Sequence, residues 1–243
     1  MSRNWLGAVA LLLACTGSRS VVPRDEPGAT AASVATSASG SASASRTADN
    51  EKPAPKLALH LVPIGDVTDD AVKETATALT DHAPVVVTIE KRGALPKEAE
   101  SSEKGRYRAE KLLDWLAKRD LAKGGKIMGV TDIDIVTEKN GILNWGVLGL
   151  GAIDGRMAVI STYRMKRKWE KGGGASETLV RSRLWKISLH ELGHTLGLPH
   201  CPNKGCIMED AQGTVKTVDD ETALCADCSK RFSDAVDALV LSK

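Results

Sequence analysis

The sequence predicts a single α/β domain with a mixed β-sheet, which we place at residues 57–243 of the 243-residue chain. After residue 56, short apolar runs typical of strands alternate with longer segments in which apolar residues have helical spacing. Two of the strand candidates flank a turn at Asp154 and Gly155, so we expect them to form an antiparallel hairpin at one edge of the sheet. A domain of this length can bury a sizeable core.

The individual elements follow from the same patterns. Strands are expected at residues 57–62, 85–90, 126–128, 133–137, 145–150 and 157–162. Helices are expected from a cap near Thr68 to about residue 81, over residues 104–119 and 177–196, and around Phe232, Val236, Leu239 and Val240. The helix over residues 177–196 is the longest, and it carries the chemistry described below.

The N-terminus predicts export. Arg3 precedes an apolar run at residues 5–14, which is too short to span a bilayer as a mature helix. The run ends Leu12-Leu13-Ala14-Cys15, which resembles a bacterial lipobox with Cys15 as the lipidated residue. We therefore interpret residues 1–15 as a lipoprotein signal peptide and expect a membrane-anchored protein on the periplasmic or extracellular side of the cell envelope. An ordinary signal peptide and a short buried segment are the alternatives.

Residues 16–56 contain mostly Ala, Ser, Thr and Pro and have no hydrophobic periodicity. Such a segment cannot bury enough apolar surface to offset the entropy lost on ordering. We expect it to be a disordered tether between the anchor and the domain.

A histidine motif dominates the long helix. His190 and His194 lie one turn apart, so both imidazoles can reach one metal ion, and Glu191 lies at the edge of the same face. Gly197 permits a left-handed turn after the helix, which brings His200 back as a third ligand. Three histidines with an open fourth position are typical of a catalytic zinc site. The alternative is a set of polar residues on an amphipathic surface helix, although three of the five histidines lie here.

Four cysteines follow the histidines. Cys201 and Cys206 form one close pair, and Cys225 and Cys228 form a second. Two close pairs separated by a longer loop are typical of tetrahedral structural zinc, so the chain would hold two zinc ions. Disulfide bonds, with three possible pairings, are the alternative.

Together these residues resemble the archaemetzincins, a family of metzincin zinc peptidases. The family joins His-Glu-x-x-His-x-x-Gly-x-x-His to Cys-x4-Cys-x-Met and a later Cys-x-x-Cys, and this chain has the pattern from His190 to Cys228. Met208 stands where the family has the methionine below the catalytic zinc. The resemblance covers most of residues 57–243, and it implies a metzincin-like fold and peptide-bond hydrolysis.

The ligand set predicts a mechanism. Glu191 would accept a proton from the water that attacks a peptide or protein substrate, and an extended substrate would pair with an edge strand near residues 157–162. A zinc-binding envelope lipoprotein without catalytic activity, and a zinc amidase acting on cell-wall peptides, are the alternative functions. The net charge of +2, with both signs well mixed, argues against a nucleic-acid partner. We expect a monomer.

Overall fold

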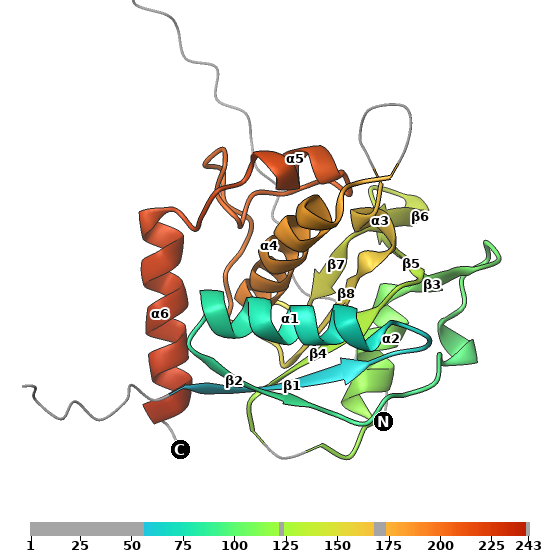
Figure 1. Ribbon diagram of the computed structural model, residues 1–243, viewed down its shortest axis with the longest axis horizontal. Helices are drawn as coiled ribbons and strands as arrows, with labels where there is room; N and C mark the ends of the chain where they lie inside the picture. Colours follow the sequence, from blue (N-terminus) through green and yellow to red (C-terminus); the bar gives the residue numbers. More distant parts are fainter. Residues whose placement is uncertain (1–55, 122–123, 168–173, 242–243) are drawn as a thin grey trace, which may run out of the picture. The chain divides into compact units, whose positions relative to one another are not determined.

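Five strands form the central sheet of the computed structural model, which describes residues 56–121, 124–167 and 174–241 (Figure 1). They run in the order β2 (Val85–Ile89), β1 (Leu57–Pro63), β4 (Lys126–Thr131), β8 (Met157–Ser161) and β7 (Gly149–Gly151). The first four are parallel, and β7 pairs with β8 in the antiparallel sense. The expected mixed sheet with an antiparallel edge strand is therefore confirmed.

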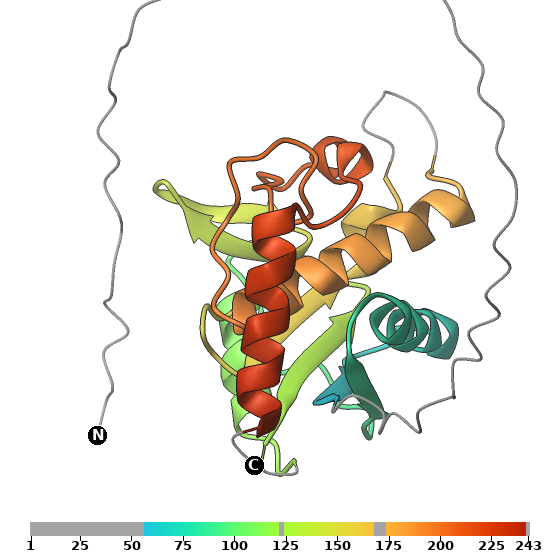
Figure 2. The same ribbon diagram turned by 90° about the vertical axis from the view of Figure 1, so that its left-hand side faces the viewer.

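Helices cover both faces of this sheet. Leu61 and Met128 are paired across β1 and β4, and they share a core with α1 (Asp69–His82), α4 (Glu177–Thr195) and α6 (Ala226–Leu241). α6 contacts β1, and Figure 2 shows α6 in front of the other elements, with its outer side toward the viewer. The alternate residues Val62 and Val159 point to the opposite face, where they pack against α2 (Ala109–Ala117).

A smaller sheet lies next to the central one. It contains β3 (Arg106–Arg108), β5 (Asp134–Lys139) and β6 (Ile142–Val147), in that order. β5 and β6 form a hairpin whose turn residues, Asn140 and Gly141, both have positive φ. The described residues also contain three short helices, namely η1 (Lys97–Ala99), α3 (Thr162–Met165) and α5 (Val215–Asp220), which the sequence did not predict.

The helix expected over residues 104–119 is partly wrong. Residues Arg106–Arg108 form strand β3, and α2 begins only at Ala109. Arg106 pairs with Asp134 in β5 through both the backbone register and a side-chain ion pair of 3.0 Å. These tertiary contacts override the local preference, because the apolar helical spacing itself starts no earlier than α2.

The strand expected over residues 145–150 is two strands in different sheets. β6 ends at Val147 and belongs to the small sheet, whereas β7 begins at Gly149 and pairs with β8. The expectation that residues 157–162 form the edge is wrong as well, since β8 has neighbours on both sides. Among the described residues, the edge strand on that side of the central sheet is β7.

Among the described residues, we find no helix that is both long and apolar enough to cross a membrane. The expected signal peptide, the lipidated Cys15 and all of the expected tether except residue 56 fall outside the described residues.

Candidate functional site

His190 and His194 lie on the last turns of α4 and point toward one another. Both are buried, and their Nε2 atoms are 3.0 Å apart. The Nδ1 of His190 is 2.6 Å from the carbonyl oxygen of Ile207, and that of His194 is 2.8 Å from the carbonyl of Leu198. A carbonyl can only accept, so each Nδ1 carries the proton and each Nε2 keeps a free lone pair. Both imidazoles are thus held in the tautomer that binds a metal through Nε2.

Gly197 turns the chain back toward these imidazoles. Its φ of +85° is left-handed, and its N–H bonds to the carbonyl of His194, while the N–H of Leu198 bonds to the carbonyl of Gly193. This is a Schellman motif, which ends a helix in a defined direction. The turn places the His200 ring 5.4 Å from that of His190 and 4.9 Å from that of His194, measured between centroids. One ligand nitrogen from each of the three lies within 4.8 Å of the others.

The pKa values of the three imidazoles are lowered, which favours the neutral form that binds a metal. Burial, together with the neighbouring His194, lowers the pKa of His190 to about 3. Burial also lowers the pKa of His194 to about 4 and that of His200 below its ordinary value. All three are therefore neutral at pH 7, and neutral imidazole is the form that coordinates zinc.

Glu191 lies beside the histidines with its carboxyl group against β7. It is 5% exposed, and burial raises its pKa to about 8, while the N–H of Gly151 opposes that shift. A Cβ on Gly149 would lie only 2.5 Å from the Glu191 Oε1, and one on Gly151 would lie 2.6 Å from the Glu191 carbonyl oxygen. The lack of a side chain at both glycines therefore allows β7 to approach α4 so closely, with the backbone contact at Gly151 the stricter of the two.

Met208 packs beneath the histidine turn. It is fully buried, and its Sδ would lie 2.7 Å from a Cβ on Gly193, the residue before His194. Its carbonyl accepts the N–H of Cys201 at 2.7 Å. The position is the one that the archaemetzincin pattern assigns to the methionine below the metal.

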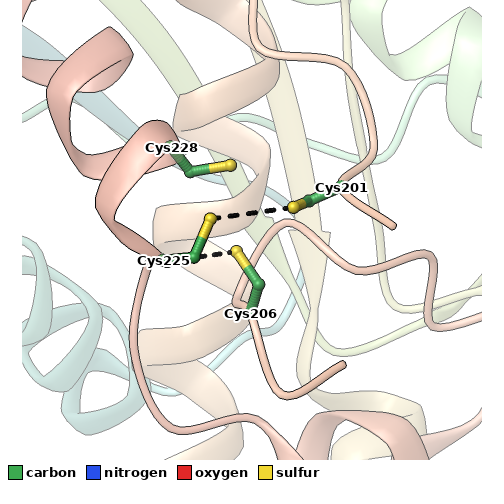
Figure 3. Close-up of side chains that lie close together, drawn as sticks. All are labelled: Cys201, Cys206, Cys225 and Cys228. Atoms are coloured by element: carbon green, nitrogen blue, oxygen red, sulfur yellow. Dashed lines mark hydrogen bonds between the residues drawn. The ribbon is translucent and has the colours of Figure 1, made fainter. Parts of the chain in front are cut away.

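The four cysteine sulfurs converge, with Cys201 and Cys206 coming from the loop after α4 and Cys225 and Cys228 from the start of α6 (Figure 3). One sulfur from each lies within 4.8 Å of the others, and those of Cys201 and Cys225 are 3.8 Å apart. A tetrahedron with Zn–S bonds of about 2.3 Å has an edge of about 3.8 Å. The cluster therefore fits one zinc ion, and all four thiols are free of disulfides.

Three thiols of the cysteine cluster have pKa values shifted by their surroundings. The N–H of Cys228 and the amide of Asn203 lower the pKa of the Cys225 thiol to about 6. Burial raises the pKa of Cys206 and Cys228, so these two thiols need a cation nearby to become thiolate ligands.

The histidines open into a cleft of about 300 Å³. Its walls are β7, the β5–β6 hairpin with Lys139 and Trp145, and the loop with Asp210 and Gly213. A larger hollow of about 450 Å³ lies between α1 and α4, but none of its lining residues belongs to either metal-binding group. We therefore assign the site to the smaller cleft.

The sequence did not identify Gly149, Gly151, Lys139 and Asp210 as parts of this cleft. The alternating Gly-Leu-Gly of β7 was an available signal, because glycine inside a strand marks a close approach of backbone. Lys139 and Asp210 are 71 residues apart, and no local pattern links them.

A mixed α/β domain whose His-Glu-x-x-His helix lies under an antiparallel edge strand is the arrangement of a zinc metallopeptidase. The sequence profile of peptidase family M54 matches residues 66–234. An archaemetzincin of Haloarcula marismortui is 33% identical over 173 residues, covering 70% of this chain and 96% of the relative. One of Natronomonas pharaonis is 34% identical over 177 residues, covering 71% and 97%. The chain belongs to peptidase family M54, the archaemetzincins.

Solved structures agree with this assignment. The crystal structure of archaemetzincin from Methanopyrus kandleri aligns with a TM-score of 0.63 and 26% identity, over 76% of this chain and 98% of that one. The archaemetzincin from Archaeoglobus fulgidus, at 24% identity, shares the fold with a TM-score of 0.60 over 72% of this chain and 99% of its own. The protein is thus a zinc metallopeptidase with the expected fold.

Proposed function

We propose that His190, His194 and His200 hold a catalytic zinc ion and that Glu191 is the general base of peptide hydrolysis. The observation that carries this proposal is the buried Glu191 carboxyl, which faces the cleft beside three neutral imidazoles. A purely structural zinc site would not require such a group, because a buried carboxyl costs stability unless it is paired.

When bound by His190, His194 and His200, a zinc ion would polarise the scissile carbonyl, lower the pKa of a water molecule toward 7, and by its charge favour the ionised form of Glu191. The Glu191 carboxylate then accepts the proton of the attacking water and passes it to the departing amine. The N–H of Gly151 holds the carboxylate toward the cleft. His190 and His194 keep their orientation because the carbonyls of Ile207 and Leu198 hold their Nδ1 protons.

The substrate binds in extended form along β7. This strand is at the edge of the central sheet, and its residues also line the cleft. Main-chain pairing to an edge strand is a general mode of peptide recognition, and it would lay the peptide across the histidines. The exposed Ile153, which follows β7 and also lines the cleft, offers an apolar contact to a substrate side chain.

The cysteine cluster holds a second, structural zinc ion, so the loaded chain contains two. Four protein ligands close the coordination sphere, which is the pattern of a structural rather than a catalytic site. The cluster braces the catalytic loop, since Cys201 directly follows His200.

Replacement of Glu191 by Gln tests the catalytic role. The amide keeps the size of the side chain but cannot accept the proton, so hydrolysis should fall by roughly 10²–10⁴-fold while zinc content and melting temperature stay close to wild type. Mass spectrometry of a peptide library, cleaved by the zinc-loaded wild type, supplies the substrate. Retention of near-wild-type hydrolysis in Glu191→Gln would falsify the mechanism.

The same library distinguishes the alternatives. A zinc-loaded wild type that cleaves nothing would support a zinc-binding envelope protein. Cleavage restricted to cell-wall peptides would support the amidase.

We further propose that Cys15 carries a lipid anchor and that residues 16–56 tether the domain to the envelope. The lipobox-like Leu12-Leu13-Ala14-Cys15 supports this proposal. In a bacterial host, Cys15→Ala should move the protein from the membrane fraction extracted with detergent to the soluble fraction, because more than one lipid chain is needed for stable attachment. Equal partitioning of variant and parent would contradict the anchor.

A further inference from the structure

His200 is held differently from the other two histidines. Its side chain is 47% exposed, whereas His190 and His194 are buried. Within the described residues its imidazole makes no hydrogen bond of normal length. The carboxylate of Asp210 faces it, with Oδ2 3.9 Å from the His200 Nδ1. Of the three candidate ligands, His200 therefore depends most on a neighbour to fix its ring.

Asp210 is itself firmly placed. The Nζ of Lys139 donates to both carboxylate oxygens, at 2.9 Å to Oδ2 and 3.2 Å to Oδ1. The N–H of Gln212 donates to Oδ1 at 2.8 Å. Gln212 and Gly213 both have positive φ, so the chain turns sharply just after the carboxylate. Asp210 is thus fixed from the β5–β6 hairpin on one side and from its own loop on the other, with Oδ2 toward His200.

We propose that Asp210 is the positioning residue of His200, and that Lys139 holds the Asp210 carboxylate for this task. The proposal rests on the zinc site of the proposed function. A carboxylate that accepts the Nδ1 proton fixes the tautomer in which Nε2 is free, and it raises the basicity of the ligand. The exposed ring has room to turn by the amount needed for a charge-assisted bond of about 2.8 Å.

A purely structural role for these residues makes a different prediction. Lys139 and Asp210 are each about one-third exposed, and ion pairs of that exposure contribute little to stability. If the pair only joined the hairpin to the loop, its removal would leave the affinity for zinc unchanged. Zinc affinity at the histidines therefore separates the two roles.

The test measures zinc dissociation from the full-length protein by competition with a chromogenic chelator. Asp210→Asn should weaken binding at the histidine site by roughly 10–100-fold, the usual effect of removing a partner behind a metal ligand. The zinc at the cysteine cluster, whose own ligands are unchanged, should be affected much less and serves as an internal reference. Asp237→Asn, at an exposed position on α6, is the matched control and should bind zinc like wild type.

Lys139 provides the second pair of variants. Lys139→Met should weaken zinc binding at the histidine site in the same direction, because Asp210 loses its partner, and Lys139→Arg should restore it. A lower Tm of metal-free Asp210→Asn than of the metal-free wild type would show that this substitution destabilises the fold itself. In that case the zinc affinities of Lys139→Met and Lys139→Arg test the proposal. Unchanged zinc affinity in Asp210→Asn and Lys139→Met would overturn the proposal.

The outcome is independent of catalysis. A wild type that binds zinc at the histidines but hydrolyses no peptide would contradict the proposed function, yet the affinities of the variants would still test the role of Asp210. A wild type that hydrolyses peptides, with variants of equal zinc affinity, would contradict only the role of Asp210.

Discussion

Gly149 and Gly151 occupy alternate positions on β7 and determine how closely the strand approaches α4. Side chains two apart in a strand lie on the same face, so both absent side chains would point at Glu191. The contacts differ in kind. A Cβ on Gly149 meets the carboxyl end of Glu191, which can rotate, whereas one on Gly151 meets its backbone carbonyl and the Cβ of His194. We therefore expect Gly149 to control the position of the base, and Gly151 to control the fit of the strand.

Gly149→Ala should displace the Glu191 carboxylate without removing any metal ligand. A misplacement of about 1 Å can cost roughly 10²-fold in rate, so we expect a 10–100-fold loss of kcat/KM at unchanged zinc content. Gly174→Ala is the matched control, because its new Cβ would lie 3.6 Å from the nearest atom, an ordinary contact. Steady-state kinetics and zinc analysis of both variants check the expectation, and a kcat/KM for Gly149→Ala equal to that of the control would contradict it.

The residues that the sequence predicted are those linked by short-range spacing. One helical turn separates His190 from His194, and a glycine turn separates His194 from His200, so local geometry alone predicts that they converge. The carboxyl group of Asp210 behind His200 could not be predicted in this way. Its partner Lys139 lies on a hairpin far away in the sequence, and their contact exists only once the small sheet has formed.

Contacts from the central sheet fix the C-terminal end of α4. The Nζ of Lys126, at the start of β4, donates to the carbonyl of Thr195 at 2.6 Å and to that of Gly155 at 2.8 Å. The N–H of Asp154 donates to the carbonyl of His194 at 3.0 Å. Burial lowers the pKa of Lys126, but a cation at the negative end of a helix is favoured. Lys126 thus joins the metal-binding helix to the β7–β8 hairpin.

Lys126→Met keeps the aliphatic stem and removes both donated hydrogen bonds. Leaving these carbonyls without a charged donor should cost about 1–3 kcal/mol, and hence lower the Tm by roughly 2–12 °C for a domain of this size. Lys104→Met, at an exposed position before β3, should leave the Tm within about 1 °C, as is usual for surface substitutions. Calorimetry of the zinc-loaded variants gives both values. Equal melting of the two variants would show that Lys126 does not fix the helix end.

Element prediction succeeded where one pattern governed a whole segment. The cap at Thr68 and the long helix through His194 were found close to their true ends, since Thr68 and Ser176 cap the two helices and Gly197 turns the chain just after the second. It failed at Arg106–Arg108 and at the junction of β6 and β7. There the chain passes between two sheets, and pairing with distant strands decides the conformation.

The two metal-binding groups form one connected structure. The segment from Cys206 to Met208 lies between them. The carbonyl of Ile207 accepts from His190, and its N–H donates to the carbonyl of Ala223, close to Cys225 in the chain. Cys201 follows His200 directly and donates its N–H to Met208. A change at the cysteines should therefore reach the histidines through hydrogen-bonded backbone.

Replacing Cys225 and Cys228 together by Ser tests this connection. Serine is a poor zinc ligand, so the zinc content should fall from two ions per chain to one. Because metal binding is coupled to folding, the loss of several kcal/mol should lower the Tm by roughly 10 °C or more. The remaining ion at the histidines should dissociate faster, since Ile207 is held less firmly behind His190. Elemental analysis, calorimetry and chelator competition measure the three effects, with Ser233→Ala on α6 as the control.

A wild type with one zinc and no free thiols would instead indicate disulfides, and unchanged release of the histidine zinc would show that the two groups act independently.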